Sequence, residues 1–436
     1  MQYYSTNSTD TYVSLREAIL RSLAPGGGVY MPKSVPVIPT ALFRNIADMS
    51  LTDIAYVAGS VLFSSDIPQA TINDIVKQTL DFDIPLVPVS PSMFALELFH
   101  GPSGSFKDIG ARFMARLVDY FVNSDRSFCG KINVLVATSG DTGCAVAHGF
   151  AGIENVNVFI LRPKGKLLRI PSDHTLSPAS NIIPISIRGT FEDCQQLVRQ
   201  AYADDSLYKR LNLTSANSIN IARLLPQTFY LFHAYARLLE QTGSQTSQFV
   251  ISMPCGNLGN LTASLFALQM GIPVSRIIAA GHGDERLWGY MRRGQLAVSD
   301  LNSRSLNTNL SRINRFIMTN PTMASQIECH TYCDKDIDNQ IRHTYDDCGY
   351  LMDRNTAMAC KALTDGLHNG ETGVFLATAD PAKYNLHLSR ILGPDAKLPQ
   401  LASSATTSQK VRDTDNGVTL PPLYSSLRNF LINNNV

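Results

Sequence analysis

From residue 86 onward, short apolar runs typical of β-strands alternate with longer stretches whose apolar residues recur at helical spacing. The strand-like runs are Ile132–Ala137, Val156–Leu161, Ile182–Ile187, Phe249–Met253, Ile277–Ala280 and Val374–Ala377. The helical stretches include residues 105–122, 191–203, 219–241 and 260–270. Because parallel strands are usually joined by a crossover helix, this alternation predicts an α/β fold with parallel sheets covered by helices.

The composition is that of a globular protein and gives no sign of a highly charged partner. Hydrophobic residues make up 44% of the 436 residues, charged residues make up 17%, and the formal net charge is +1. Without a long basic or acidic run, strong binding to nucleic acid or to an anionic membrane is not expected. The first residues lack a secretory pattern, and no apolar run reaches the ~18 residues of a membrane span. We therefore expect a cytoplasmic protein.

Eight cysteines are too few for a disulfide framework in a chain of this length, which favours a reducing compartment. Four candidate metal ligands lie close together in sequence: Cys329, Cys333, His343 and Cys348. Their spacing contains no compact Cys-x-x-Cys pair, and the region is typical of a loop that runs into a helix. We therefore expect ordinary cysteines and no metal.

The segment His100–Asp108 holds the first candidate catalytic residue, Lys107. Glycine and proline predict a turn, Ser105 is the expected N-cap, and apolar residues then follow on one helical face. Lys107 thus falls in the first helical turn, where the positive end of the helix dipole disfavours a cation. A lysine that forms a Schiff base must lose its proton, and this position helps it to do so. A solvated lysine beside Asp108 is the alternative, and the segment alone does not decide between them.

Two glycine-containing turns each follow a predicted strand and precede a predicted helix. They are Ala137–Gly143 (ATSGDTG) and Met253–Asn260 (MPCGNLGN). Backbone N–H groups converge at the start of a helix, so each turn is suited to a carboxylate or a phosphate. The second turn is neither a Walker loop nor a GxGxxG loop, and a phosphate monoester suits it better than a pyrophosphate. A plain turn between strand and helix remains the alternative for each.

A fourth segment, Val374–Tyr384, is a buried strand that ends in Thr378, Asp380 and Pro381. Ligands usually lie at the ends of strands in α/β sheets, although a turn before proline explains the same residues. Taken together, an imine-forming lysine, two anion loops and a polar strand end are the groups that pyridoxal 5'-phosphate requires.

With these motifs the chain resembles the long form of the threonine synthases, within the fold-type II pyridoxal-phosphate enzymes. The resemblance covers most of the chain. It is carried by VSLREAILRSLAPGGGVYMP (residues 13–32), HGPSGSFKDIGARFMARL, ATSGDTGCAVAHGF, SANSINIARLLPQTFYLFHAY (215–235), PCGNLGN, ATADPAKY and the final helix.

The resemblance implies a fold with two α/β lobes and a mainly helical N-terminal region. Within residues 1–85, apolar residues recur at helical spacing in 14–23, 41–63 and 70–80. Whether the chain is a monomer or a homodimer is left open. The expected division is the helical region (1–85), a large cofactor-binding domain (86–130 and 215–395), a smaller α/β domain (131–214) and a polar loop with a C-terminal helix (396–436).

The resemblance also implies roles for individual residues. Lys107 would hold pyridoxal 5'-phosphate as an imine and act as the acid–base, and Thr378 would offer its hydroxyl to the pyridine nitrogen. The cofactor phosphate would be held by Gly256, Asn257, Leu258, Gly259 and Asn260. The substrate carboxylate and the cofactor edge would be met by Ser139, Asp141 and Thr142. The substrate phosphate would be met by Lys166, Asn217, Asn220 and Arg223.

Several positions depart from the family pattern, and they affect the substrate prediction rather than the cofactor prediction. Asp380 replaces the usual histidine, and Arg354-Asn355 lie where the family has Pro-His after aspartate. If Asp380 reached the pyridine nitrogen in place of Thr378, a different balance of eliminations would follow. The remaining departures are in residues 167–174, 281–284 and 303–316.

We therefore expect the chain to convert O-phospho-L-homoserine and water into L-threonine and phosphate. A phospho-lyase that ends at 2-oxobutyrate would use the same residues without capture of water. A serine or threonine dehydratase acts on a substrate without phosphate, so the predicted ligands of the substrate phosphate would have no function. A non-catalytic binding protein is the last alternative, and retention of Lys107 and of both glycine loops argues against it.

Overall fold

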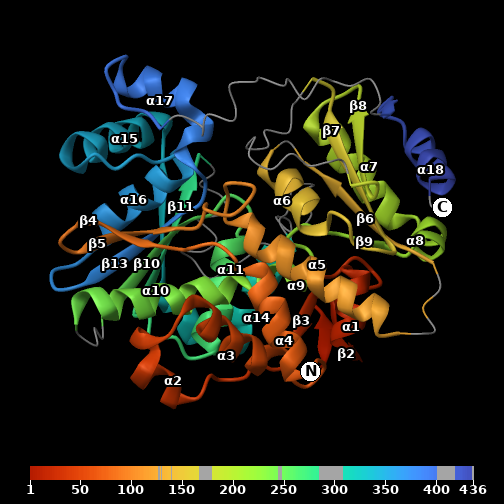
Figure 1. Cartoon of the computed structure of the whole chain (residues 1–436), viewed down its shortest axis with the longest axis horizontal. Coiled ribbons are helices and arrows are strands. Elements are labelled where there is room, and N and C mark those ends of the chain that lie inside the picture. The colour runs from red at the N-terminus through yellow and green to blue at the C-terminus, as the bar shows by residue number, and fades with distance from the viewer. Residues whose placement is uncertain are drawn as a thin grey trace. The chain divides into compact units, whose positions relative to one another are not determined.

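Figure 1 shows the computed structural model of the chain, which describes residues 1–125, 128, 130–138, 140–165, 179–243, 248–283, 308–399 and 418–434. The chain forms two compact units: unit 1 (Met1–Lys33, Pro102–Arg223 and Leu401–Val436) and unit 2 (Ser34–Gly101 and Leu224–Gln400). The four-part division expected from the sequence has other boundaries and stays a prediction. Within the described ranges, no helix is long and apolar enough to cross a bilayer.

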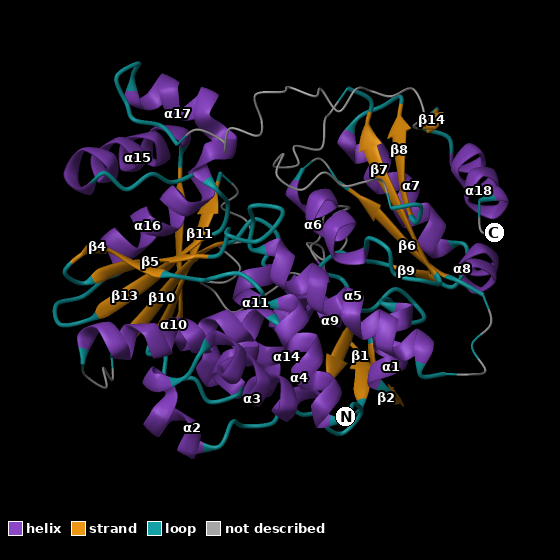
Figure 2. Cartoon of the chain, in the orientation of Figure 1, coloured by secondary structure: helices purple, strands orange, loops and turns teal. Residues whose placement is uncertain are grey.

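Unit 1 is built on a parallel sheet whose described strands have the order β14-β8-β7-β6-β9. These strands are β6 (Ile132–Ala137), β7 (Val156–Pro163), β8 (Ile182–Ile187), β9 (Leu213–Thr214) and β14 (Val418–Leu420). The helices are α1 (Leu15–Arg21), α5 (Lys107–Asn123), α6 (Asp141–Phe150), α7 (Phe191–Ala203), α8 (Asp205–Leu211) and α18 (Tyr424–Asn433). Leu135 and Phe159 of the sheet pack with α7, α8 and α18, and α6 lies on the opposite face (Figure 2).

The first 32 residues contain a small antiparallel sheet that the helical prediction for residues 1–85 did not include. In it, β1 (Tyr3–Ser5) lies between β2 (Ser8–Val13) and β3 (Tyr30–Pro32). Two of these strands have three residues each, and β2 is polar and largely exposed. Alternation of apolar and polar residues therefore gives no signal for this sheet.

Unit 2 is built on a second sheet, with the described order β12-β11-β10-β13-β5-β4 and only β4 antiparallel to its neighbour. Its strands are β4 (Leu86–Ser90), β5 (Met93–Glu97), β10 (Phe249–Pro254), β11 (Arg276–His282), β12 (Ile327–Tyr332) and β13 (Thr372–Ala377). Its helices are α2 (Thr40–Asn45), η1 (Ile46–Asp48), α3 (Leu51–Phe63), α4 (Gln69–Thr79), α10 (Gln227–Thr242), α11 (Gly259–Gln269), α14 (Thr308–Thr319), η2 (Pro321–Gln326), α15 (Asp334–Cys348), α16 (Arg354–Gly366), η3 (Pro381–Tyr384) and α17 (Asn385–Leu392).

Alternate residues of the central strand β10 face opposite helical layers. Val250 lies in a buried cluster with Leu363 of α16, whereas Ile251 lies with Leu231 of α10. Figure 2 shows α16 and α10 on opposite sides of this sheet. Because both faces are covered, the strands are nearly continuous apolar runs. The α/β prediction is confirmed in both units.

The single helix expected over residues 219–241 is two helices, α9 (Ile221–Leu224) and α10. Pro226 immediately precedes α10. Proline lacks the N–H that would continue a helix, and it disfavours helical backbone at the residue before it. Arg223 therefore does not lie at the start of a long helix, and that part of the prediction was wrong.

Segments that the sequence singled out also lie outside the described residues. They are residues 167–174, Asp284, 303–307 and 400–417.

Asp204 joins the C-terminal helix to α8 within unit 1. Its carboxylate accepts hydrogen bonds from the Ser206 hydroxyl (2.7 Å) and the Leu207 N–H (3.0 Å) at the start of α8. It also accepts from the Tyr424 hydroxyl (2.7 Å) and from Nε of Arg428 (3.0 Å) in α18. These hydrogen bonds, that of Ser206 foremost, hold the pKa of Asp204 well below its ordinary value of 3.8.

Replacing Asp204 with alanine should lower the free energy of unfolding by about 1–3 kcal/mol at neutral pH, because a helix cap and charge-assisted hydrogen bonds are lost. Since the folded-state pKa is depressed, this stabilisation is present above the ordinary pKa of 3.8 and is lost as the pH falls below it. Urea denaturation of both proteins at neutral and acidic pH measures the difference. Asp205→Ala, at an exposed neighbouring carboxylate, is the control. An equal loss in the control would contradict this role for Asp204.

Candidate active site

Lys107 is the first residue of α5 and so lies in the first helical turn, as predicted, beside a carboxylate at the start of a second helix. Its Nζ lies 3.4 Å from Oδ2 of Asp141, the first residue of α6. The two side chains are 23% and 20% exposed. Lys107 is therefore a largely enclosed lysine with a fixed ionic partner, and it is not the solvated surface lysine of the alternative.

The turn before Lys107 is held by buried polar groups rather than by the N-cap that the sequence predicted. The Ser105 hydroxyl lies 2.9 Å from the Ser103 hydroxyl, and Phe106, which has helical backbone, immediately precedes α5. The Asp108 carboxylate accepts the backbone N–H of Ser103 at 2.8 Å. Because Ser103, Ser105 and Asp108 are all fully buried, this turn holds the backbone in front of Lys107 in place.

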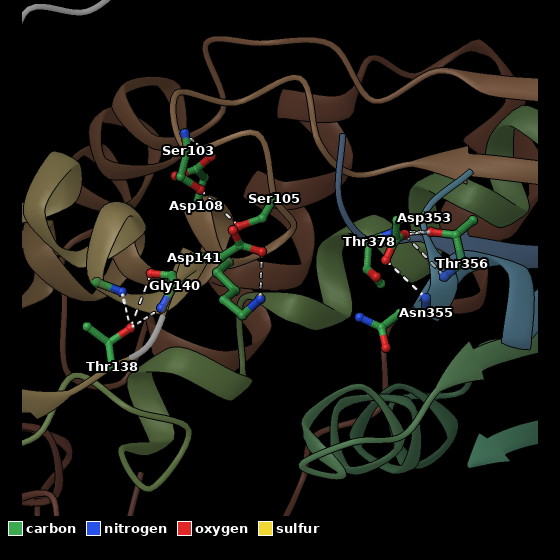
Figure 3. Close-up of polar contacts among 12 residues, drawn as sticks. Ser103, Ser105, Asp108, Thr138, Gly140, Asp141, Asp353, Asn355, Thr356 and Thr378 are labelled. Carbon is green, nitrogen blue, oxygen red and sulfur yellow. Dashed lines mark hydrogen bonds and ion pairs between the residues drawn. The ribbon is translucent and has the colours of Figure 1, made fainter. Parts of the chain in front are cut away.

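The turn between β6 and α6 leaves open space above a helix N-terminus. The Thr138 hydroxyl accepts the backbone N–H groups of Gly140 (3.1 Å) and Gly143 (3.0 Å), which closes the turn (Figure 3). A Cβ on Gly140 would meet no atom within 4 Å. This space is suited to an anion, because the helix dipole and the backbone N–H groups favour negative charge there. Thr142 lies in the first turn of α6, whereas Ser139 lies outside the described residues.

Asn220, predicted to meet the substrate phosphate, has internal partners in unit 1. Its Nδ2 donates to the Ile19 carbonyl at 2.7 Å, and its Oδ1 accepts the Ala222 N–H at 3.0 Å. Because the residue is fully buried, these contacts favour a structural role. Asn217 is partly exposed, and Lys166 lies outside the described residues.

Arg223 is also buried, and its guanidinium is directed at main-chain carbonyls. Nη1 donates to the Ala216 carbonyl at 2.6 Å, and Nη2 lies 3.5 Å from the Lys107 carbonyl. Burial lowers the pKa of Arg223 to about 10, and the charge of Asp108 opposes that shift. These contacts favour a role in holding the Lys107 turn over the predicted contact with a substrate phosphate.

In unit 2, β10 leads into the glycine loop that opens α11. Leu258 has a left-handed backbone with φ 59°, which costs a non-glycine residue roughly 1 kcal/mol or more. The Asn257 side chain accepts the Gly259 N–H at 3.1 Å, and the Asn260 side chain accepts the Tyr230 hydroxyl at 3.2 Å. A Cβ on Gly256 would meet no atom within 4 Å. A strained loop with an open surface at a helix N-terminus is suited to a phosphate.

Thr378 follows the last residue of β13 and is almost fully buried. Its backbone N–H donates to the Thr356 hydroxyl at 3.2 Å. Asp380 lies two residues on, and its carboxylate accepts the Ala382 N–H at 2.8 Å at the start of η3. This turn engages one oxygen of the Asp380 carboxylate, and the role of Thr378 at the pyridine nitrogen stays a prediction.

Two positions that depart from the family pattern meet in one charged cluster of unit 2. Arg354 forms ion pairs with Asp334 and with Asp338, the latter at 2.6 Å, and His282 lies 2.9 Å from Asp334. Arg354, His282 and Asp353 line a cavity of about 300 Å³. The sequence showed both departures, but their separation along the chain gave no signal that they would meet. Among the described residues, no group of three or more His, Cys, Asp or Glu side chains is arranged to hold a metal ion.

Comparison with known proteins agrees with this geometry. Residues 2–80 match the family model of the threonine synthase N terminus, and residues 85–379 match that of pyridoxal-phosphate-dependent enzymes. The threonine synthase of Haemophilus influenzae is 35% identical over 407 residues, which are 92% of this chain and 93% of that protein. The chain belongs to the threonine synthase family. The Escherichia coli threonine synthase is 33% identical over 441 residues, covering 99% of this chain and 100% of that protein.

Solved structures of this family have the same fold. The crystal structure of Escherichia coli threonine synthase has a TM-score of 0.83 and 32% identity, and the match covers 99% of this chain and 100% of that one. The PLP-bound threonine synthase of Brucella melitensis has a TM-score of 0.84 and 26% identity, with coverage of 99% and 98%. The predictions of family, fold type and cofactor are confirmed.

Replacing Arg223 with alanine should lower the free energy of unfolding by about 3 kcal/mol or more, because the buried carbonyls and Asp108 lose their cationic partner. Thermal or urea denaturation of the apoprotein measures the loss. Arg199→Ala is the control, since Arg199 is exposed and its pair with Glu192 should contribute less than about 1 kcal/mol. Unchanged stability, with a loss of turnover confined to phosphorylated substrates, would instead support the predicted contact with the substrate phosphate.

Proposed function

We propose that this chain converts O-phospho-L-homoserine and water into L-threonine and phosphate, with pyridoxal 5'-phosphate as cofactor. The observation that carries the proposal is Lys107, enclosed at the start of α5 beside Asp141, in a chain similar to threonine synthases over nearly its whole length. We also propose that the protein is cytoplasmic and has no nucleic-acid or membrane partner. The balanced net charge of +1 supports this proposal.

The residues of the chain fit the cofactor. Lys107 is the group for covalent attachment, and the open surface at Gly256, above the N-terminus of α11, is suited to the cofactor phosphate. We assign that phosphate to the loop Gly256–Asn260 and the pyridine nitrogen to the Thr378 hydroxyl. When bound, pyridoxal 5'-phosphate supplies an electron sink for negative charge that develops at the substrate α-carbon.

Lys107 also moves protons. Its amine, once released from the cofactor, is the base for the α-proton of the substrate and returns protons as the reaction proceeds. The Asp141 carboxylate, whose Oδ2 lies 3.4 Å from Nζ of Lys107, stabilises the ammonium form of Lys107 and positions it. Proton transfer depends on such positioning, because donor and acceptor must meet within hydrogen-bonding distance.

The two charged ends of the substrate are assigned to different parts of unit 1. The turn that opens α6, with Ser139, Asp141 and Thr142, receives the carboxylate, on the support of the open space at Gly140. Asn217 and Lys166 remain the proposed contacts of the substrate phosphate. Asn220 and Arg223 affect this site indirectly, because they hold the nearby backbone in place. Their bonds to the Ile19 and Lys107 carbonyls support this role.

Borohydride reduction of the protein loaded with pyridoxal 5'-phosphate should fix the cofactor on Lys107, because reduction makes the bond to that amine permanent. Peptide mapping by mass spectrometry identifies the modified lysine. Lys107→Ala should lose the adduct and the turnover of O-phosphohomoserine, whereas Lys383→Ala, a buried lysine outside the proposed site, should keep the adduct. An adduct on another lysine would refute the site assignment, and no adduct would refute the enzyme function.

Replacing Gly256 with alanine should weaken binding of pyridoxal 5'-phosphate by about tenfold or more without destabilising the apoprotein. The added methyl group enters open space in the folded chain but occupies the surface assigned to the phosphate. Fluorescence titration gives the Kd, and thermal denaturation gives the apo Tm. Gly373→Ala is the control, since its Cβ would lie 2.5 Å from Leu363 and should lower the apo Tm. Unchanged affinity in the Gly256 variant would contradict the phosphate assignment.

A further inference from the structure

Two buried side chains of unit 2, those of Asp353 and Thr356, form a hydrogen-bonded series that ends at the backbone N–H of Thr378 (Figure 3). Asp353 immediately precedes α16, Thr356 lies in the first turn of that helix, and Thr378 follows β13. The three residues are 1%, 1% and 3% exposed. Water therefore does not substitute for these bonds, and the loss of one leaves a buried polar group without that partner.

The hydrogen bonds in this series have a fixed direction. An ionised carboxylate only accepts, so the Thr356 hydroxyl donates its single hydrogen to Asp353. The hydroxyl oxygen is then left to accept the backbone N–H of Thr378, at 3.2 Å. Asp353 also accepts the backbone N–H groups of Asn355 (3.0 Å) and Thr356 (3.2 Å), which holds the carboxylate at the start of α16.

Thr378 depends on this series because the sheet no longer holds it. The last residue of β13 that pairs with β5 is Ala377, whose carbonyl accepts the Leu98 N–H at 2.9 Å. The next N–H, that of Thr378, is bonded to Thr356 instead. The backbone of Thr378 is therefore tied to the start of α16 as well as to β13.

The start of α16 is itself anchored by ion pairs. Arg354, its first residue, forms ion pairs with Asp334 and Asp338 of α15, the latter at 2.6 Å. Nη1 of Arg354 also lies 3.2 Å from Nε2 of His387 in α17. Asp353 and Thr356 thus rest on a helix terminus that two neighbouring helices hold in place.

We propose that Asp353 and Thr356 are positioning residues, which orient the Thr378 hydroxyl toward the pyridine nitrogen of the cofactor. The proposal rests on the proposed function, in which Thr378 meets that nitrogen. A neutral hydroxyl at a fixed position leaves the nitrogen largely unprotonated, whereas a displaced hydroxyl would change the polarity around it. The series therefore tunes how strongly the bound cofactor withdraws electrons, although neither Asp353 nor Thr356 is assigned a contact with it.

The test compares Thr356→Val, which removes the hydroxyl, with Thr356→Ser, which keeps it. In the apoprotein, Thr356→Val should speed hydrogen exchange of the Thr378 amide by about fivefold, since a hydrogen bond is worth about that factor. In the loaded protein, Thr356→Val should shift the absorption maximum of the bound cofactor and lower kcat more than it raises KM. Thr356→Ser should restore the exchange rate, the absorption maximum and the kinetic constants.

Thr364→Val is the matched control, because Thr364 lies on the exposed side of the same helix and donates to the Cys360 carbonyl. It should leave exchange, spectrum and kcat unchanged. Asp353→Asn keeps a good helix cap but removes the charged acceptor of the Thr356 hydroxyl. It should shift the cofactor spectrum in the same direction as Thr356→Val.

The results separate failure of this proposal from failure of the proposed function. If Thr356→Val lowers the apo Tm but leaves the cofactor spectrum and kcat at wild-type values, Thr356 is only structural and the proposal is overturned. If amide exchange of Thr378 is unchanged, the series does not hold Thr378 and the proposal is also overturned. If the wild-type protein binds no pyridoxal 5'-phosphate, the proposed function fails, while the exchange measurement still reports on the series.

Discussion

The start of a helix directly after a parallel strand is the constraint that the glycine turns of the two units share. Such a helix exposes backbone N–H groups that the helix does not use, and its dipole favours negative charge there. In unit 1, α6 begins four residues after β6 ends, and in unit 2, α11 begins five residues after β10 ends. Both turns have a glycine at which a side chain would enter open space. Each unit therefore has a turn that is suited to an anion before any charged side chain is considered.

Charged and hydroxyl side chains then adapt these two turns to one chemistry. In unit 1, Lys107 and Asp141 begin two neighbouring helices, so a nucleophilic amine lies beside the turn assigned to a carboxylate. In unit 2, Thr378 lies at the end of β13, in the same sheet as the strand that leads into the glycine loop. Much of the surrounding polarity is structural, since Asp108, Asn220 and Arg223 are buried against backbone groups.

The sequence predicted those features that depend on local spacing. Helix α7 has the predicted bounds, Lys107 begins its helix, and both glycine turns lie between strand and helix. Residues 1–32 form an antiparallel sheet that apolar periodicity could not show, because its strands are very short or polar. Pro226 marks the break between α9 and α10 in the sequence, but the apolar pattern continues on both sides of it and predicts one helix.

Contacts between residues far apart in the chain could not be predicted from spacing. Asn220 bonds to a carbonyl 201 residues away, and Arg223 bonds to one 116 residues away, and neither contact has a signal in the sequence. Thr356 lies 22 residues before Thr378, and nothing in that spacing indicates a contact between them. Conversely, the family motifs identified the cofactor, because they contain an imine-forming lysine, two anion loops and a polar strand end, which are the groups that pyridoxal 5'-phosphate requires.

The central claim is that the chain forms threonine from a phosphorylated amino acid. Its most direct test is incubation of the loaded protein with O-phospho-L-homoserine, followed by separate quantification of phosphate, threonine and 2-oxobutyrate. The account predicts one threonine for each phosphate released and little 2-oxobutyrate. Release of phosphate with 2-oxobutyrate as the main product, or no release of phosphate, would contradict it.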